Sequence, residues 1–507
     1  MGEPIECDVL VVGGGINGAG IARDAAGRGM SVVLCDKDDL AAHTSSSSTK
    51  LIHGGLRYLE HYEFGLVRKA LAEREVLLRA APHIMWPLRF VMPHDKGQRP
   101  AWMIRAGLFL YDHLARRELL PASTGIDLRR HIAGKPLKNN FTRGFIYSDG
   151  WVDDARLVVL NAMDAAEKGA AVFTRTACTA VVRHDDHWQA SLTGPAGVAT
   201  DLRARCVVNA TGPWASIFLD SAAREASGKS VRLVKGSHII VKKLFDHDYA
   251  YIFQHPDGRI IFAIPYEQDF TLIGTTDLDY GGSADQVAID ADEIGYLCAL
   301  SNHYFEKSIA PADVVWSYSG VRPLLHDEAA DASAVTRDYQ LDFDIKRAPM
   351  LSVFGGKITT FRKLAEEAVD LVASYLANAA GAWTETACLP GGDLFGAVPS
   401  NRSVLEFAQF TQGLQTRYAW LPAALVARYA RAYGTRTDAL LAGRRSIGEM
   451  GDEIAAGLYA AEVHYLMRHE WACSATDILW RRSKLGLHLP ALTTARLDAW
   501  ILANPVG

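Results

Sequence analysis

The sequence predicts an α/β protein in which a βαβ nucleotide-binding unit comes first, antiparallel strands form a middle region, and helices form the C-terminal region. Three observations predict this order: a glycine-rich βαβ pattern over residues 8–37, alternating strand patterns over residues 231–280, and helical patterns from Asn401 onward. A chain of 507 residues is long enough for about three domains.

The glycine-rich pattern reads DVLVVGGGINGAGIARDAAGRGMSVVLCDK. It predicts a strand, a helix and a second strand, at residues 8–12, 16–28 and 31–35. Gly13, Gly15 and Gly18 form a G-x-G-x-x-G turn, which permits a tight bend, close approach of a pyrophosphate, and packing of the helix on the strand. Asp36 lies 23 residues after Gly13, where a carboxylate accepts hydrogen bonds from a ribose. Together these features predict a Rossmann-like dinucleotide-binding domain.

Both FAD and NAD use such a turn, and three later segments favour FAD. Residues 41–50 form a hydroxyl-rich loop that suits a pyrophosphate and a flavin edge. Residues 205–216 are expected to form a strand that returns the chain to the cofactor. Residues 351–376 place a second helix N-terminus after a Gly-Gly pair. Each segment also has a plainer interpretation: a disordered polar loop, an ordinary strand-to-turn exit, and another αβ corner of the sheet.

Eight motifs in one order carry a family resemblance: GGGINGAGIARDAAGRG, TSSSSTKLIHGGLRYLEHYEFGLV, YSDGWVDDARLV, VNATGPW, KGSHI, IGTTDLDY, YSGVRPL and SVFGGKITTFRKLAEEA. Together they resemble FAD-dependent glycerol-3-phosphate dehydrogenases of the bacterial, respiratory kind. The resemblance implies oxidation of sn-glycerol 3-phosphate to dihydroxyacetone phosphate, non-covalent FAD, and transfer of electrons to a membrane quinone. Asp36 departs from the family, in which Glu is usual, but both acids accept from a ribose.

We predict that residues of these segments bind FAD. They are Gly13, Gly15, Asn17, Gly18, Asp36, Thr44, Ser45, Ser46, Gly54, Gly55, Ala210, Thr211, Gly212, Gly355, Gly356, Lys357, Ile358 and Thr359. Gly54 and Gly55 are expected to let the flavin ring lie close to the backbone. No metal site is predicted.

A site for glycerol 3-phosphate needs cations for the phosphate and an acceptor for the hydroxyl proton. The resemblance assigns Arg57, Tyr58, Arg322 and Lys357 to the substrate pocket, and guanidinium groups fit phosphate oxygens. His53 titrates near neutral pH and suits proton removal, and it would share a helical face with Arg57 four residues later. His238 is the competing base.

The middle of the chain alternates in the manner of antiparallel strands, over VRLVKGSHIIVKK and RIIFAIPYEQDFTLIGTTDLDY, with a turn at 267–269. Residues 388–400, rich in Gly and Pro, mark the start of the helical region. We therefore expect an FAD-binding domain at 1–80, 145–228 and 335–387, a substrate region at 81–144 and 229–334, and a C-terminal helical domain at 388–507.

Residues 99–143 hold nine Lys or Arg residues and three acids in a chain whose net charge is −5. Within this segment we expect a helix near 101–115, with Arg105, Asp112 and Arg116 on one stripe. Its other faces are apolar, through Trp102, Met103, Leu108, Phe109, Leu110 and Leu114. Such a helix lies in an anionic membrane surface or, equally well, is a core helix with a charged edge.

Composition excludes several classes of protein. The negative net charge argues against nucleic acid as a partner, and seven cysteines without a CxxC pair argue against a disulfide framework or a zinc site. No secretory signal or long apolar run is recognised, so we expect a cytoplasmic protein that does not span a membrane. The quinone acceptor that the resemblance implies favours the membrane-surface interpretation of residues 99–143, so we expect the protein to be peripheral on the inner face of the cytoplasmic membrane. A homodimer is left open.

Two other functions remain as alternatives. One is a flavin oxidase of the same fold that acts on an amine or passes electrons to oxygen. The other is a non-enzymatic FAD-binding protein with a relict turn. The cations Arg57 and Arg322 speak against an amine substrate, and the intact HGG and GGK motifs speak against a relict.

Overall fold

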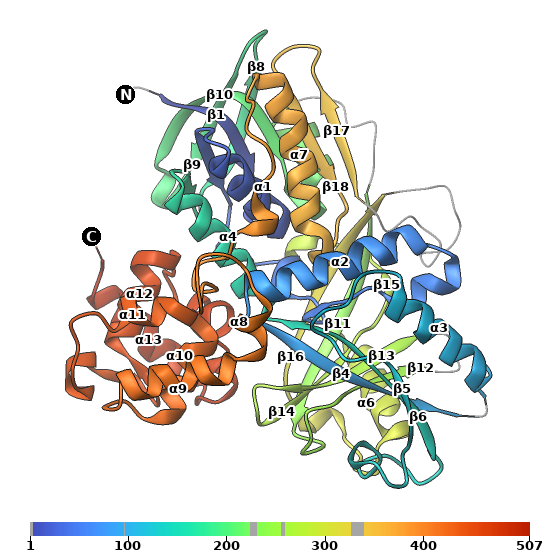
Figure 1. The fold of residues 1–507 in the computed structure, drawn as a ribbon. Coiled ribbons are helices and arrows are strands. Elements are labelled where there is room, and N and C mark those ends of the chain that lie inside the picture. The colour runs from blue at the N-terminus through green and yellow to red at the C-terminus, as the bar shows by residue number, and fades with distance from the viewer. Residues whose placement is uncertain (1–3, 96, 224–230, 255–258, 326–338, 507) are drawn as a thin grey trace.

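The computed structural model describes residues 4–95, 97–223, 231–254, 259–325 and 339–506. The fold is α/β, with two large sheets and a C-terminal helical region that packs beside them (Figure 1). This is the architecture that the sequence predicts: a Rossmann-like FAD-binding domain, an antiparallel β region and a C-terminal α-helical domain.

The first sheet has eight strands, in the order β17-β18-β10-β1-β2-β7, with β9 and β8 continuing from β10. The central pairs β18–β10, β10–β1, β1–β2 and β2–β7 are all parallel. The strands are β1 (Ile5–Val12), β2 (Val32–Cys35), β7 (Ala171–Phe173), β8 (Ala177–Arg183), β9 (Trp188–Thr193), β10 (Ala199–Asn209), β17 (Gln340–Asp344) and β18 (Met350–Phe354).

Three helices belong to this sheet: α1 (Ile16–Gly27), α4 (Asp154–Glu167) and α7 (Phe361–Leu376). They share one apolar core with the strands, and α1 packs against both α4 and α7. The predicted βαβ unit is confirmed as β1, α1 and β2. The chain leaves α1 at Gly29, whose φ of 80° lies in the left-handed region that favours glycine.

The second sheet has ten strands and runs β15-β11-β14-β13-β12-β4-β6-β3, with β16 beside β11 and β5 beside β6. All its pairs are antiparallel except β12 with β4. The strands are β3 (Leu51–Ile52), β4 (Met85–His94), β5 (Thr124–Asp127), β6 (Arg143–Val152), β11 (Val231–Lys242), β12 (Ala250–Gln254), β13 (Ile260–Tyr266), β14 (Phe270–Gly274), β15 (Leu278–Asp279) and β16 (Val314–Leu325).

Strands β3 and β6 lie in this second sheet, although most of their residues fall within the ranges 1–80 and 145–228 that we expect for the FAD-binding domain. The reason is pairing between distant segments: β6 pairs along its length with β4, from Met85 with Val152 to His94 with Arg143. A register of this kind depends on tertiary contacts that a local pattern does not reveal.

Helices cover both faces of the second sheet. Successive residues of a strand point to opposite faces of the sheet. Ile239 and Ile240 of β11 accordingly pack in two different apolar clusters, one on each face. Helix α6 (Ala291–Tyr304) packs on one face, and α2 (Phe64–Ala80) and α3 (Ala101–His113) pack on the other.

Helix α3 differs from its prediction in two respects. Leu108 is only 1% exposed and packs in the core beside Tyr111, so it is not available to a membrane. Arg116 lies beyond the end of the helix, where it pairs with Glu118, so it does not extend the stripe of Arg105 and Asp112. One face of α3 is therefore part of the core, as one of the two interpretations expected, and the opposite face is exposed.

The C-terminal region has its own apolar core. Its helices are α8 (Asn401–Leu405), α9 (Phe407–Arg417), α10 (Ala423–Tyr433), α11 (Thr437–Leu440), α12 (Ala460–Glu470) and α13 (Leu492–Ala503). It also contains the short strands β19 (Glu453–Ala455) and β20 (Leu458–Tyr459) and a π-helical segment, Asp477–Arg482. Within the described ranges, no helix is long and apolar enough to cross a membrane.

Candidate active site

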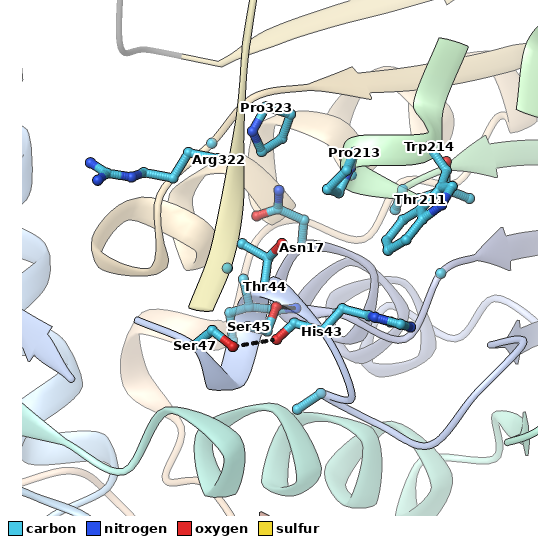
Figure 2. Close-up of a pocket in the computed structure, with 18 of the residues that line it drawn as sticks. Asn17, His43, Thr44, Ser45, Ser47, Thr211, Pro213, Trp214, Arg322 and Pro323 are labelled. Atoms are coloured by element: carbon cyan, nitrogen blue, oxygen red, sulfur yellow. Dashed lines mark hydrogen bonds between the residues drawn. The ribbon is translucent and has the colours of Figure 1, made fainter. Parts of the chain in front are cut away.

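A cavity of about 580 Å³ lies between the two sheets. The carboxyl ends of β1, β10 and β18 open into it, which is where open α/β sheets bind ligands. Figure 2 shows part of its lining: Asn17 and the hydroxyl loop (residues 41–50) lie below Pro213 and Arg322. Segments far apart in the sequence therefore meet at one site.

The glycine turn forms the phosphate end of the cavity. A side chain at Gly13 would lie 2.5 Å from the carbonyl oxygen of Ala210, and one at Gly18 would lie 1.8 Å from that of Gly13. Gly15 is the N-cap of α1, and Ser45 Oγ accepts the N–H of Ile16 at 3.0 Å. Gly18 does not line the cavity, because its role is the close packing that the motif requires.

The Asp36 carboxylate lies directly after β2 and lines the cavity. It accepts the backbone N–H groups of Gly14 at 2.6 Å and Asp38 at 2.8 Å, which fixes its orientation at the end of β2. Burial raises the pKa of Asp36, and these two donors act in the opposite direction. His43, which bonds to Asp38 at 2.7 Å, stands edge-on to Trp214 farther along the same wall (Figure 2).

Hydrogen bonds to two other parts of the chain hold the hydroxyl loop, which contradicts its interpretation as a disordered polar loop. Thr44 Oγ1 donates to the carbonyl of Val321 at 2.8 Å, and Ser48 Oγ donates to Asp154 at 2.7 Å. Thr44 and Ser45 line the cavity as predicted. Ser46 does not: its hydroxyl donates to the carbonyl of His43 at 3.2 Å. Six further loop residues that we did not predict also line it, namely Ala41, Ala42, His43, Ser47, Ser48 and Thr49.

The second Gly-Gly corner meets the first turn through Asn17. Asn17 Nδ2 donates to the carbonyl of Gly355 at 3.2 Å, while its buried Oδ1 has no hydrogen-bond partner within the described structure. Gly355 and Gly356 have φ values of 76° and 98°, and a side chain at Gly356 would lie 2.8 Å from Asn17 Nδ2. Further predicted FAD residues line the same cavity: Ala210, Thr211, Gly212, Lys357, Ile358 and Thr359.

These features fit FAD. Gly13 and Gly15 line the cavity without side chains, which suits a pyrophosphate, and the Asp36 carboxylate beside them suits a ribose. Asn17 Oδ1 is a buried acceptor in need of a donor. Gly54 and Gly55 do not line the cavity. The room left at Gly54 is taken by neighbouring side chains, since a Cβ there would lie 2.6 Å from Leu71 and 2.7 Å from Tyr111 Oη.

The predicted substrate residues lie in the same cavity as the FAD residues. His53, Tyr58, His238, Arg322 and Lys357 all line it. Lys357 Nζ lies 4.1 Å from the centre of the Tyr58 ring, and Arg322 Nη2 lies 3.5 Å from Asp277 Oδ1. Lys357, which follows β18 of the first sheet, and Arg322, in β16 of the second, thus both line the cavity, and both act on the pKa of His53.

Arg57 is the one predicted pocket residue whose side chain lies outside the described structure. The expectation that it shares a helical face with His53 is wrong. The 3-10 helix Leu56–His61 begins only after Gly55, whose φ is 73°, so His53 precedes the helix.

The two histidines differ in their surroundings. Burial lowers the pKa of His53, and Lys357 and Arg322 act in the same direction, whereas the carboxylate of Asp149 opposes them. Burial lowers the pKa of His238 to about 3. His238 Nε2 bonds to Thr49 Oγ1 at 3.0 Å.

A buried network supports the loop that carries His53. The N–H of Gly54 donates to Tyr111 Oη at 2.8 Å, and Tyr111 donates to Asp149 at 2.8 Å. Arg74 donates to the same carboxylate at 2.5 Å. We did not predict a role for Tyr111, Arg74 or Asp149. Asp149 belongs to the YSDGWVDDARLV motif, which is the one sequence signal that could have identified it.

A nucleotide-type glycine turn, a second Gly-Gly corner, a carboxylate at the end of β2 and an adjoining cationic pocket define a flavin-dependent oxidoreductase. Comparison with known families agrees. Residues 8–362 match the FAD dependent oxidoreductase family, and residues 382–500 match the C-terminal domain of alpha-glycerophosphate oxidase.

Three similar relatives are named as dehydrogenases of small phosphorylated alcohols. The chain is 54% identical to a glycerol-3-phosphate dehydrogenase of Pseudomonas aeruginosa (97% of this chain, 94% of the relative) and 48% identical to the aerobic glycerol-3-phosphate dehydrogenase of Escherichia coli (98% and 97%). It is also 50% identical to a D-erythritol 1-phosphate dehydrogenase of Brucella abortus (99% and 98%). The chain belongs to the FAD-dependent glycerol-3-phosphate dehydrogenase family.

A solved structure supports the fold and the cofactor. The glycerol-3-phosphate dehydrogenase from Bacillus halodurans, complexed with FAD, superposes with a TM-score of 0.79 at 26% identity, over 98% of this chain and 90% of that one. FAD is therefore the cofactor of this protein.

Proposed function

We propose that the protein oxidises sn-glycerol 3-phosphate to dihydroxyacetone phosphate. The observation that carries this proposal is that Arg322 and Lys357 line the same cavity as His53 and the FAD residues, and that both cations act on the pKa of His53. A small phosphorylated alcohol needs all three functions: cations for its dianion, a base for its hydroxyl, and a flavin for its hydride.

FAD, when bound, would supply the acceptor for the hydride of the alcohol carbon. Arg322 and Lys357 hold the phosphate, Arg322 through its planar donor fork and Lys357 as a point charge. With the phosphate fixed, the secondary hydroxyl faces His53, and a neutral ring nitrogen of His53 removes its proton. A base must be neutral to accept a proton, and the lowered pKa of His53 keeps it neutral at physiological pH.

We expect anaerobic addition of glycerol 3-phosphate to bleach the flavin absorbance of the purified holoprotein. Glycerol at the same concentration should leave the spectrum unchanged, because it offers no charge to Arg322 and Lys357. Equal bleaching by glycerol would contradict the phosphate clamp. Bleaching by a small amino acid instead would favour the amine-oxidase alternative, and reoxidation by air alone would favour oxygen as acceptor.

D-erythritol 1-phosphate is a second candidate substrate, because a relative named for its oxidation is about as similar as those named for glycerol 3-phosphate. It is longer by one hydroxylated carbon and carries the same phosphate. Comparing the single-turnover reduction constants of the two phosphates on one preparation of holoprotein decides between them. Reduction by both at similar rates would define a small polyol phosphate dehydrogenase.

We propose further that a membrane quinone accepts the electrons and that α3 contacts the anionic inner surface of the cytoplasmic membrane. The outer face of α3 supports this, because Trp102 is 70% exposed and Phe109 is 59% exposed, with Met103 and Leu110 beside them. Tyr62, which precedes α2, and Phe64, its first residue, add two exposed rings. An apolar helix face with basic neighbours is typical of interfacial helices, and each nearby Lys or Arg adds about 1 kcal/mol of attraction to anionic lipid.

We expect the triple variant Trp102→Ser, Met103→Ser and Phe109→Ser to lose most of its co-sedimentation with anionic vesicles. Reduction of a quinone in those vesicles should fall more than reduction of a soluble dye. Leu108 is left intact because it is part of the core. The matched control is Leu492→Ser with Leu502→Ser, which removes two exposed leucines from α13. Wild-type protein that stays in the supernatant at low salt would contradict the membrane proposal.

A further inference from the structure

The C-terminal region reaches back to the FAD-binding end of the first sheet. Asp39, three residues after the ribose carboxylate Asp36, is 3% exposed. It accepts from Arg482 Nη1 at 2.7 Å and Nη2 at 2.8 Å, and from Arg481 Nε at 2.6 Å. Both arginines belong to the π-helical segment, more than 440 residues away in sequence.

A second carboxylate completes this contact. Asp477, on the same π-helical segment, pairs with Arg481 and accepts from Arg175 Nη2 at 2.5 Å. The backbone N–H of Arg175 donates in turn to the carbonyl of Asp38 at 2.8 Å. The turn after β2 is thus held through the side chain of Asp39 and through the backbone of Asp38.

The far end of the hydroxyl loop is held in the same way. Asp154, at the start of α4, accepts from the N–H of Ser48 at 3.2 Å and from Lys50 Nζ at 2.7 Å. The preceding residue, Asp153, pairs with Lys484 of the C-terminal region at 3.2 Å. Both ends of residues 36–50 are therefore connected to residues 477–484 of the C-terminal region, one through Asp39 and the other through Asp154 and its neighbour Asp153.

The residues between these anchors face the cofactor cavity. Asp36, Ala41, His43 and Ser45 line it, whereas Asp39 does not and is turned toward the C-terminal region. Because Asp39 is buried and bonded to two arginines, moving it would separate charges in a poorly solvated place. The backbone from Asp36 to Ser45 is correspondingly restricted.

We propose that the C-terminal region holds residues 36–48 in the shape that binds FAD, and so sets how tightly FAD is retained. Arg481 and Arg482 are positioning residues in this arrangement, since they act through Asp39 and do not line the cavity.

The test is the affinity of the apoprotein for FAD, measured by titration of flavin fluorescence. Arg481→Gln should weaken FAD binding by about tenfold or more, as expected when a charge-assisted contact that orders a binding loop is lost. Arg481→Lys keeps the charge and should restore part of the affinity. The thermal unfolding midpoint of each apoprotein, recorded in parallel, separates loss of cofactor affinity from loss of fold.

The matched control is Arg436→Gln. Arg436 also joins the C-terminal region to the first domain, through Glu167 at 2.6 Å, but it does not contact residues 36–50. If Arg436→Gln weakens FAD binding as much as Arg481→Gln, the effect is general loosening and the proposal is wrong. Normal FAD affinity in folded Arg481→Gln would also overturn it. If Arg481→Gln does not fold, Arg175→Gln takes its place, because the Arg175 side chain is less buried. We expect this variant to lose several-fold in affinity for FAD. An unchanged affinity for FAD would contradict the proposal.

Discussion

His53→Asn should slow reduction of the flavin by glycerol 3-phosphate by about a hundred- to ten-thousand-fold, the usual contribution of a general base. Asn keeps a polar side chain of similar size but cannot take up the hydroxyl proton. Binding of dihydroxyacetone phosphate should change little, because Arg322 and Lys357 remain. Rapid mixing of anaerobic holoprotein with saturating substrate measures the rate, and displacement of product from the oxidised enzyme measures the binding.

The pH dependence distinguishes the two histidines. The pKa of His53 is lowered, so the residue is neutral and active at neutral pH, and the limiting rate should fall as the pH drops through its lowered pKa. The pKa of His238 is about 3, so a rate that depends on its neutral form would not fall over the same interval. A near-normal rate in His53→Asn, together with a large loss in His238→Asn, would assign the base to His238.

Arg322→Ala should reduce kcat/KM for glycerol 3-phosphate by about ten- to a hundred-fold, which corresponds to the roughly 1.5–3 kcal/mol typical of a hydrogen bond to a charged group. The loss should appear mainly in KM if Arg322 holds the phosphate equally well before and during reaction. The flavin content should stay at one per chain. Lysine at this position should recover only part of the loss, because it lacks the planar fork.

Two measurements support the interpretation of this variant. Arg129→Ala removes a surface arginine that pairs only locally with Asp127, and it should leave kcat/KM unchanged. Inorganic phosphate should compete with substrate in the wild-type protein and much less in Arg322→Ala. An unchanged inhibition constant for phosphate in Arg322→Ala would show that the phosphate binds elsewhere, for example at Lys357 alone.

The nucleotide-binding part of the fold could be predicted because its signal is local. Gly13, Gly15 and Asp36 act within one βαβ unit, and their chemistry follows from spacing along the chain. Several segments that line the cavity could be predicted for a related reason. Each of them ends a strand in a turn that its own sequence reveals, such as Gly355-Gly356. Residues far apart then meet because parallel strands share one carboxyl edge.

Other features depend on tertiary contacts that leave no local pattern. Gly54 resembles a glycine that admits a flavin, but its missing side chain leaves room for Leu71 and Tyr111. Leu108 and Phe109 are adjacent apolar residues of one helix, yet one is core and the other surface, and only the position of the second sheet decides which. Asp39 carries no signature at all, since its partners lie at the opposite end of the chain.

The contact between Asp39 and the π-helical segment has a consequence for the order of events during synthesis. The ribosome makes the glycine turn and the hydroxyl loop among the first 50 residues, but Arg481 and Arg482 only near the end of the 507-residue chain. A nascent chain that has already folded its βαβ unit still lacks the partners of Asp39. If the C-terminal region sets how tightly FAD is retained, as proposed above, stable loading of the flavin should come only after that region has been made and has docked.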